Sequence, residues 1–147
     1  MAETTIELRH ATARDQGYLL HCIQEAYHEF PRLLARGEDS LAQAAENDYE
    51  HATEGVIQVA MLEGRQVGAA WWLPGDEAGT LTAAYYVEPD VRGRGIATRL
   101  LEAGMAAARQ RGVRSVAIRT HPENAASIAL ARKVGFEPMV MLLRKNL

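Results

Sequence analysis

The chain has 147 residues, 48% of them hydrophobic and 24% charged, which predicts one globular domain over residues 1–147 and excludes a transmembrane helix, since no apolar run reaches roughly 20 residues. The N-terminus lacks the basic and apolar stretches of a secretory signal, and the single cysteine excludes an intrachain disulfide, so a cytoplasmic location is expected. The net charge of −3 is the sum of −9 over residues 1–79 and +6 over residues 80–147. This asymmetry indicates either that the C-terminal half binds a polyanion and the N-terminal half binds a cation, or that both halves are simply solvated surfaces.

The first third of the chain predicts a strand followed by two helices. Ile6 to Arg9 is the strand, and Thr12 with Asp15 has the spacing of a capping box. The next helix ends or kinks at Pro31, and an acidic, alanine-rich helix covers Ser40 to about Thr53. The apolar positions of the first helix have helical spacing and place the only cysteine in the core: Leu19, Cys22, Ile23, Ala26, Tyr27 and Phe30.

The middle of the chain predicts a β-hairpin and a third strand. Val56 to Leu62 and Gln66 to Leu73 are strand-like runs joined by a turn at 63–65 that contains glycine. A second turn at 74–76 contains proline and glycine, and a strand from Leu81 to Val87 follows it.

The last third alternates helices and strands. It predicts a helix over Ile96 to Arg111 that stops at Gly112, a strand over Val113 to Arg119, a helix from Asn124 to Gly135 and a final strand over Met139 to Arg144. The complete order, β-α-α-β-β-β-α-β-α-β, predicts an α/β (α+β) domain with a mixed sheet covered by helices.

The segment between the third strand and its following helix has the properties of an anion site. Two glycines alternate with two arginines after a proline turn, and a helix begins directly behind them. The first N–H groups of a helix have no intrahelical acceptor and can bind phosphate oxygens, while glycine lets the backbone come close. A tight strand–helix turn would also require glycine. The predicted anion site consists of Arg92, Gly93, Arg94, Gly95, Ile96, Ala97 and Thr98.

Two motifs resemble those of the GCN5-related N-acetyltransferases (GNAT). Val-x-Pro-x-x-Arg-Gly-x-Gly-Ile-Ala, from Val87 to Ala97, resembles motif A of that family. The stretch from Asn124 to Phe136, which reads Asn-Ala-Ala-Ser-Ile-Ala-Leu-Ala-Arg-Lys-Val-Gly-Phe, resembles motif B. The resemblance covers residues 55–147, whereas residues 1–54 share only the order of elements.

The resemblance implies the GNAT fold, with a mixed, mostly antiparallel central sheet that is splayed at the cofactor strand and has helices on both faces. It also implies acetyl-CoA as the co-substrate. It places Tyr85, Tyr86 and Val87 along the pantetheine arm of the cofactor. It further implies that the amides of residues 93–98 hold the pyrophosphate and that Asn124 contacts the arm from the other side. Asn124 is also an ordinary helix N-cap.

The catalytic residues of the family are absent. The tyrosine that protonates the departing thiolate in the family corresponds to Ala131, and two glutamate positions used by some members fall at Leu81 and Arg119. Three explanations stay open: positioning alone, a substitute side chain, or binding of acyl-CoA without turnover. The substitutes nearest in sequence are Tyr85, Tyr86, Glu88, His121 and Ser127.

The resemblance assigns the acceptor to the acidic N-terminal half, which suits a cationic small-molecule or peptide amine. Glu25 and Glu29 would attract the ammonium, and the aromatic rings of Phe30, Trp71 and Trp72 would hold it. However, adjacent residues of a strand point to opposite faces, so at least one of the two tryptophans belongs to the core.

The sequence therefore predicts an N-acetyltransferase in which the amine attacks acetyl-CoA directly in a ternary complex. The alternative is a non-catalytic acyl-CoA sensor on the same fold. A dinucleotide-binding fold is disfavoured because Thr98 replaces the third glycine of its fingerprint. Nucleic acid and membrane partners are not expected, no His/Cys cluster has metal-ligand spacing, and the resemblance is compatible with a homodimer.

Overall fold

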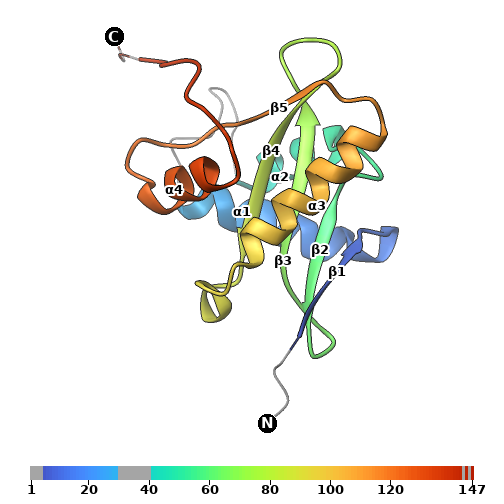
Figure 1. The fold of residues 1–147 in the computed structure, drawn as a ribbon. Coiled ribbons are helices and arrows are strands. Elements are labelled where there is room, and N and C mark those ends of the chain that lie inside the picture. Colours follow the sequence, from blue (N-terminus) through green and yellow to red (C-terminus); the bar gives the residue numbers. More distant parts are fainter. Residues whose placement is uncertain (1–4, 30–40, 144, 146) are drawn as a thin grey trace.

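A mixed five-stranded sheet forms the centre of the computed structural model, which describes residues 5–29, 41–143, 145 and 147 (Figure 1). The strand order is β1-β2-β3-β4-β5, in which only β4 and β5 run parallel. The strands are β1 (Ile6–His10), β2 (Gln58–Leu62), β3 (Arg65–Pro74), β4 (Thr80–Val87) and β5 (Ser115–Ile118). The helices are α1 (Gln16–Glu29), α2 (Leu41–His51), α3 (Ile96–Gln110) and α4 (Ala125–Lys133), with short 3-10 turns η1 (Ala13–Asp15) and η3 (Pro89–Val91).

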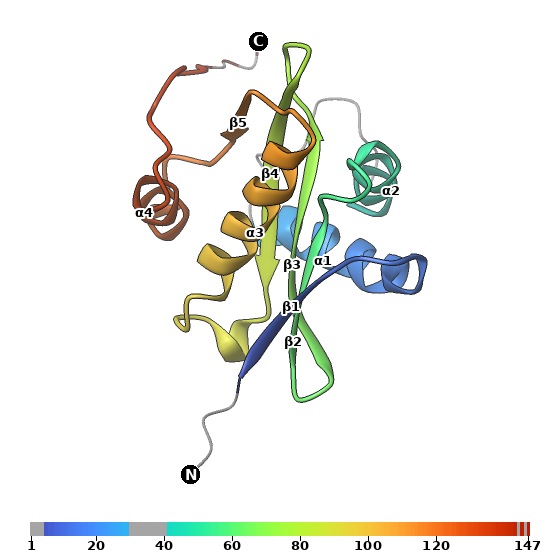
Figure 2. The same ribbon diagram turned by 45° about the vertical axis from the view of Figure 1, so that its right-hand side comes forward.

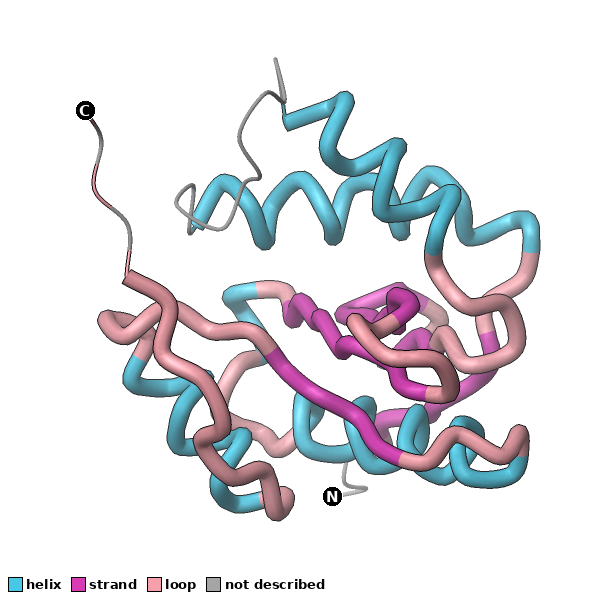
Figure 3. Tube along the Cα trace, turned by 90° about the horizontal axis from the view of Figure 1, so that it is seen from above, coloured by secondary structure: helices cyan, strands magenta, loops and turns pink. Residues whose placement is uncertain are grey.

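The helices lie on both faces of the sheet, as predicted. α1 and α2 cover one face, and α3 and α4 lie on the other (Figures 2 and 3). Among the described residues, no helix is both long enough and apolar enough to cross a bilayer. The antiparallel run from β1 to β4 excludes the parallel sheet of a dinucleotide-binding fold, although β4, α3 and β5 form one βαβ unit.

The face under α1 carries one apolar cluster. Leu19, Cys22 and Ile23 of α1 pack with Trp71 and Tyr86 of the sheet, and Cys22 is fully buried. Burial raises the pKa of the Cys22 thiol to about 12, so this cysteine is a core residue, as expected.

The opposite face is fitted closely to α3. Trp72 is fully buried there, and a Cβ placed on Gly104 of α3 would lie 2.3 Å from the Trp72 indole nitrogen. Gly104 is therefore required by the close approach of helix and strand rather than by its backbone angles.

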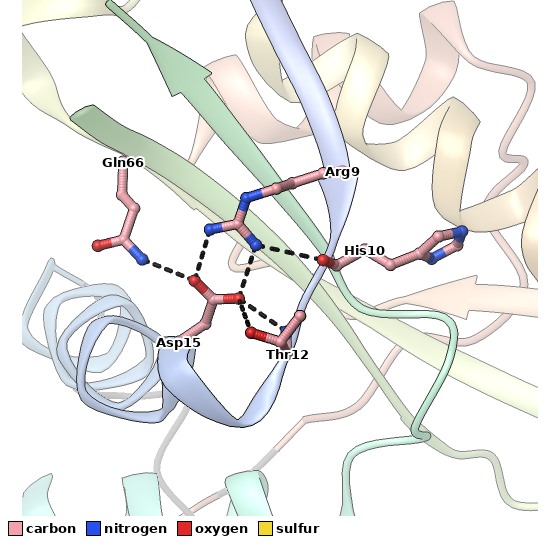
Figure 4. A network of polar contacts seen from close by, with 5 residues as sticks. All are labelled: Arg9, His10, Thr12, Asp15 and Gln66. Atoms are coloured by element: carbon pink, nitrogen blue, oxygen red, sulfur yellow. Dashed lines mark hydrogen bonds and ion pairs between the residues drawn. The ribbon is translucent and has the colours of Figure 1, made fainter. Parts of the chain in front are cut away.

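A buried carboxylate joins β1, η1 and β3 (Figure 4). Arg9 donates two hydrogen bonds to Asp15, at 2.7 and 2.8 Å, while the Thr12 backbone N–H donates to the same carboxylate at 2.7 Å and Gln66 at 2.8 Å. Asp15 is 1% exposed, so its charge is stabilised by these donors instead of by water. The predicted relation between Thr12 and Asp15 is confirmed.

The predicted hairpin is confirmed, and its turn explains the glycine between the strands. Glu63 and Gly64, which join β2 to β3, have φ of 50° and 77°. Two consecutive residues with positive φ are typical of a type I′ turn, whose twist suits an antiparallel hairpin.

Two sequence predictions need correction. Residues 139–143 of the predicted last strand form no strand, and their side chains are 83–89% exposed. The apolar run has strand composition, but a strand also requires a neighbouring edge, and this segment pairs with none among the described residues. β5 spans only 115–118 of the predicted 113–119. Phe30, Pro31, Ser40 and Arg144 lie outside the described residues.

We predict that Asp15→Asn lowers the free energy of unfolding by about 2–3 kcal/mol at neutral pH, because the charged hydrogen bonds to Arg9 are lost. The Arg9 guanidinium holds the pKa of Asp15 well below its usual range, so this stabilisation is complete above the unfolded pKa and is lost as pH falls. Urea unfolding should therefore show the difference between wild type and variant shrinking from about pH 5 to about pH 2.

Asp90→Asn is the matched control, because Asp90 pairs with Arg65 at an exposed site, where its side chain is 61% accessible. It should change stability little at any pH. Equal destabilisation by the two variants would contradict the role given to Asp15.

Candidate functional site

Half of β4 has an edge without a strand partner. β4 pairs with β3 along most of its length, from Leu81 to Val87, but with β5 only from Thr80 to Ala83. The backbone of residues 84–87 therefore has hydrogen-bonding groups on one side that no strand of the described residues satisfies, which is uncommon for a central strand. Beyond Ala83 and Ile118 the two parallel strands no longer pair, and residues 119–121 belong to no strand before the turn at Pro122 and Glu123.

The gap beside this edge opens into a cleft of about 600 Å³, a size typical of ligand sites. Its walls come from the C-terminal end of α1, β4, the loop before α3, the first turn of α3, the end of β5 and α4. Ten of the eleven predicted cofactor residues line it: Tyr85, Tyr86, Val87, Arg92, Gly93, Gly95, Ile96, Ala97, Thr98 and Asn124. The remaining one, Arg94, is exposed and is not part of the lining.

The loop before α3 has the backbone of an anion site. Gly93 and Gly95 have φ of 82° and 78°, and a Cβ added at either would meet no atom within 4 Å. Their conformation, not a lack of space, therefore requires glycine. Gly95 is the N-cap of α3, and no side chain caps the described first turn. Residues 96–98, whose N–H groups lie at the positive end of the helix, line the cleft.

Arg92 connects this loop to α1. Its Nη2 lies 2.5 Å from Glu29 Oε1, its Nε donates to the Val87 carbonyl oxygen at 2.8 Å, and its guanidinium lies 5.4 Å from the centre of the Tyr86 ring. Glu29 and Arg92 both line the cleft. The ion pair therefore joins the helix on the acidic half of the chain to the loop on the basic half.

Tyr85 of β4 and Ser127 of α4 both line the cleft. Burial raises the pKa of Tyr85, and a hydrogen bond from Ser127 acts in the opposite direction. The phenol is thus protonated near neutral pH. The predicted N-cap is also confirmed: Asn124 Oδ1 accepts from the Ser127 backbone N–H at 3.1 Å.

Two of the residues suggested as substitutes for the family's catalytic side chains have partners outside the cleft. Glu88 accepts hydrogen bonds from Tyr18 at 3.1 Å and contacts His21 at 3.0 Å, and it does not line the cleft. His121 lies 3.8 Å from Glu123 and is also outside the lining. Only Tyr85, Tyr86 and Ser127 of the five therefore reach the cleft.

The three family positions that lack a catalyst take structural or exposed roles here. Ala131 and Leu81 are each 7% exposed, and the Arg119 side chain is 75% exposed and lies 3.5 Å from Asp76.

Trp71 and Trp72 are 2% and 0% exposed, so the expectation that they hold a cationic acceptor is wrong: both are buried, on opposite faces of β3. No metal-binding group of three ligands occurs among the residues whose placement is described.

Thr120 is a cleft residue that the sequence did not reveal. Its Oγ1 is buried and has no hydrogen-bond partner within the described part of the chain, yet the residue lines the cleft. Buried hydroxyls normally have a partner, so this one is a candidate contact for a ligand. Sequence offered no signal because Thr120 belongs to neither motif.

Comparison with known proteins identifies the family. The sequence model of the Acetyltransferase (GNAT) family matches residues 19–136. Over 92 residues the chain is 35% identical to a mycothiol acetyltransferase of Saccharomonospora viridis, a match that covers 57% of this chain and 30% of that protein. Over 59 residues it is 41% identical to an L-methionine sulfoximine/L-methionine sulfone acetyltransferase of Pseudomonas aeruginosa, covering 40% and 34%. The matches thus span about a third of these curated relatives.

Solved structures of acetyltransferases have the same fold as this chain. A ribosomal-protein-alanine N-acetyltransferase from Brucella melitensis has 31% identity and a TM-score of 0.70, with 89% of this chain and 84% of that one covered. An aminoglycoside N-acetyltransferase in complex with CoA has 21% identity and a TM-score of 0.70, with 99% and 98% covered. The second likeness is evidence of the fold alone.

Proposed function

We propose that this chain, which belongs to the GNAT acetyltransferase family, is an acetyl-CoA-dependent N-acetyltransferase formed by a single domain over residues 1–147. The observation that carries the proposal is one cleft that combines the open edge of β4 with the uncapped N-terminus of α3. An extended amide-containing arm with a diphosphate at one end complements these two features, because the edge offers backbone partners and the helix N-terminus binds anions.

In the proposed complex the pantetheine arm lies along Tyr85, Tyr86 and Val87. The diphosphate binds the amides of residues 93–98, while Asn124 approaches the arm from α4. The position of these residues around one cleft supports this arrangement. Since the Arg92 side chain is paired with Glu29, the backbone amides make the larger contribution to phosphate binding.

The proposed reaction is direct attack in a ternary complex. The acceptor nitrogen, after losing a proton to water, attacks the thioester carbonyl carbon, and the C–S bond breaks to leave a thiolate that takes up a proton. Holding the two reactants together can supply roughly 7–11 kcal/mol in favourable cases. We assign the proton donor to Tyr85, a half-buried, protonated phenol that lines the cleft on the same face of the sheet as α3 and α4.

The proposed acceptor is a cationic amine, either a small molecule or a peptide. Glu29 supports this choice because it lines the same cleft at the end of α1, and a carboxylate that pairs with Arg92 through Oε1 can still accept a further hydrogen bond from an ammonium. The amine acceptors named for the aminoglycoside and ribosomal-protein-alanine acetyltransferases also fit this class. A homodimer and a cytoplasmic setting belong to the same proposal. The latter suits a chain whose only cysteine is buried and free.

A second candidate function is acyl-CoA sensing without turnover. It is favoured by the replacement of the family tyrosine and glutamates with Ala131, Leu81 and Arg119. A thiol-release assay with acetyl-CoA and a panel of primary amines separates the two. Acceptor-dependent release of CoA is expected, whereas acetyl-CoA binding with no release for any amine would favour the sensor.

We predict that Gly95→Ala weakens CoA binding at least about tenfold, because a side chain disfavours the positive φ and displaces amides that would donate to the diphosphate. Gly112→Ala is the matched control. Gly112 has φ of 80°, equally free space around its Cβ, and a position at the other end of α3. Calorimetric titration should show weak binding only for Gly95→Ala, and equal affinities would exclude this loop as the phosphate site.

We predict that Tyr85→Phe lowers kcat by about two orders of magnitude while leaving the Kd for CoA nearly unchanged, because the ring and backbone remain and only the proton donor is lost. Tyr86→Phe, which changes the adjacent cleft residue in the same way, should keep most activity. Stopped-flow measurement of thiol release checks both variants. A normal kcat for Tyr85→Phe would mean that positioning alone supports the reaction.

We predict that Glu29→Gln raises KM for a cationic acceptor about tenfold without weakening CoA binding, since a charged hydrogen bond is replaced by a neutral one. Glu102→Gln, an equal change of charge on the exposed surface of α3, should leave KM unaltered. Steady-state kinetics with the best amine of the panel tests this. An unchanged KM for Glu29→Gln would remove Glu29 from the acceptor site.

A further inference from the structure

The cleft is lined by charges of both signs. Among its described lining residues there is one carboxylate, Glu29 at the end of α1, and there are three cations, which come from the loop before α3, the end of β5 and α4: Arg92, Arg119 and Lys133. Arg92 already pairs with Glu29 and donates to the Val87 carbonyl oxygen. The carboxylate of the lining therefore balances Arg92 and leaves the charges of Arg119 and Lys133 for a ligand.

Arg119 is held only loosely by the protein. Its Nη2 lies 3.5 Å from Asp76 Oδ1, which is longer than an ordinary charged hydrogen bond, and the two side chains are 75% and 92% exposed. An ion pair of this kind in water contributes little to stability. The guanidinium can therefore exchange Asp76 for a ligand carboxylate, whose two oxygens match its parallel N–H donors.

Arg119 lies at the acyl end of the proposed cofactor site. The last pair between β4 and β5 joins Ala83 to Ile118, so Arg119 directly follows the point where the strands part. The phosphate loop lies at the other end of the open edge, beyond Val87. In the proposed complex the arm runs between these two ends, with its diphosphate at α3 and its thioester toward Arg119. A cation at this end meets the acceptor and not the phosphates.

Lys133 is placed differently. It ends α4, which lies with α3 on the face of the sheet opposite α1 (Figure 2). Ile118 packs in the apolar cluster under α3, and neighbouring side chains along a strand point to opposite faces, so Arg119 is directed toward the α1 side. Glu29 also belongs to that side. Arg119 and Glu29 therefore share the part of the cleft that the cofactor phosphates leave free.

We propose that the acceptor is a free amino acid, whose carboxylate binds Arg119 while its ammonium faces Glu29. This inference rests on the proposed acetyl transfer and narrows its acceptor class. A peptide N-terminus has an amide in place of that carboxylate, and a polyamine has none. Glu29 uses Oε1 for Arg92 and keeps Oε2 for the ammonium. Binding both charges of a small molecule fixes its orientation, which holds the nitrogen ready to attack the thioester once it has lost a proton to water.

Matched acceptors test the carboxylate directly. The set consists of neutral amino acids and the carboxamide of each, which keeps the amine and the side chain and removes only the negative charge. Thiol release from acetyl-CoA gives kcat/KM for both members of a pair. We expect wild type to prefer the acid at least about tenfold for its best acceptor, and Arg119→Gln to lose this preference because only the acid reacts more slowly. Arg119→Lys should keep part of it, since the charge remains but the paired donors are lost.

Arg132→Gln is the matched control, because Arg132 is an exposed arginine of α4 outside the cleft lining. It should retain the wild-type preference for acids. Three results would each overturn the inference: a wild type that acetylates amides as well as acids, an equal loss for acid and amide in Arg119→Gln, or a preference that disappears in Lys133→Gln and persists in Arg119→Gln.

Calorimetric titration of the same compounds into protein saturated with CoA measures the acceptor site without turnover. Binding of an acid but not of its amide, abolished by Arg119→Gln, supports the carboxylate site even if no thiol is released, a result that would contradict acetyl transfer alone. If no acid binds, or if acids and amides bind equally, the inference is wrong, while release of CoA with other amines would leave the proposed transfer standing.

Discussion

The separation of β4 from β5 is the constraint on which the rest of the site depends. Four residue pairs hold the parallel strands together, and beyond Ala83 the β4 backbone continues with one side free. Unpaired backbone groups are costly when they are buried, so an edge inside a fold has to face water or a ligand. Here it faces a cleft that ends at the N-terminus of α3, where further donors are free. The fold thus aligns backbone acceptors and donors along one channel.

The two halves of the chain meet at this channel with opposite charge. Glu29, near the end of the acidic half's first helix, contacts Arg92 in the loop of the basic half, and Tyr86 supports the same guanidinium. The asymmetry seen in the sequence therefore becomes a contact within the site. On the other side of the sheet from α3, the buried Asp15 holds β1 and the entry to α1 in place, which fixes the helix that carries Glu29.

Local signals predicted the elements whose determinants are local. The hairpin turn, the N-cap Asn124 and the glycine bend before α3 each depend on neighbours in sequence, and the structure contains all three. Predictions failed where distant groups decide. Residues 139–143 have strand composition but no partner edge within the described copy, and the burial of both Trp71 and Trp72 depends on helices packed on opposite faces. The motifs likewise could not reveal Thr120 as a cleft residue, because it belongs to neither of them.

A crystal structure of the protein with acetyl-CoA is the most direct test of the central claim. We expect the pantetheine arm beside the β4 backbone at residues 84–87 and the diphosphate on the amides of residues 93–98, with the thioester sulfur within reach of the Tyr85 hydroxyl. A structure in which this edge of β4 pairs with protein backbone, or in which the cofactor occupies another surface, would contradict it.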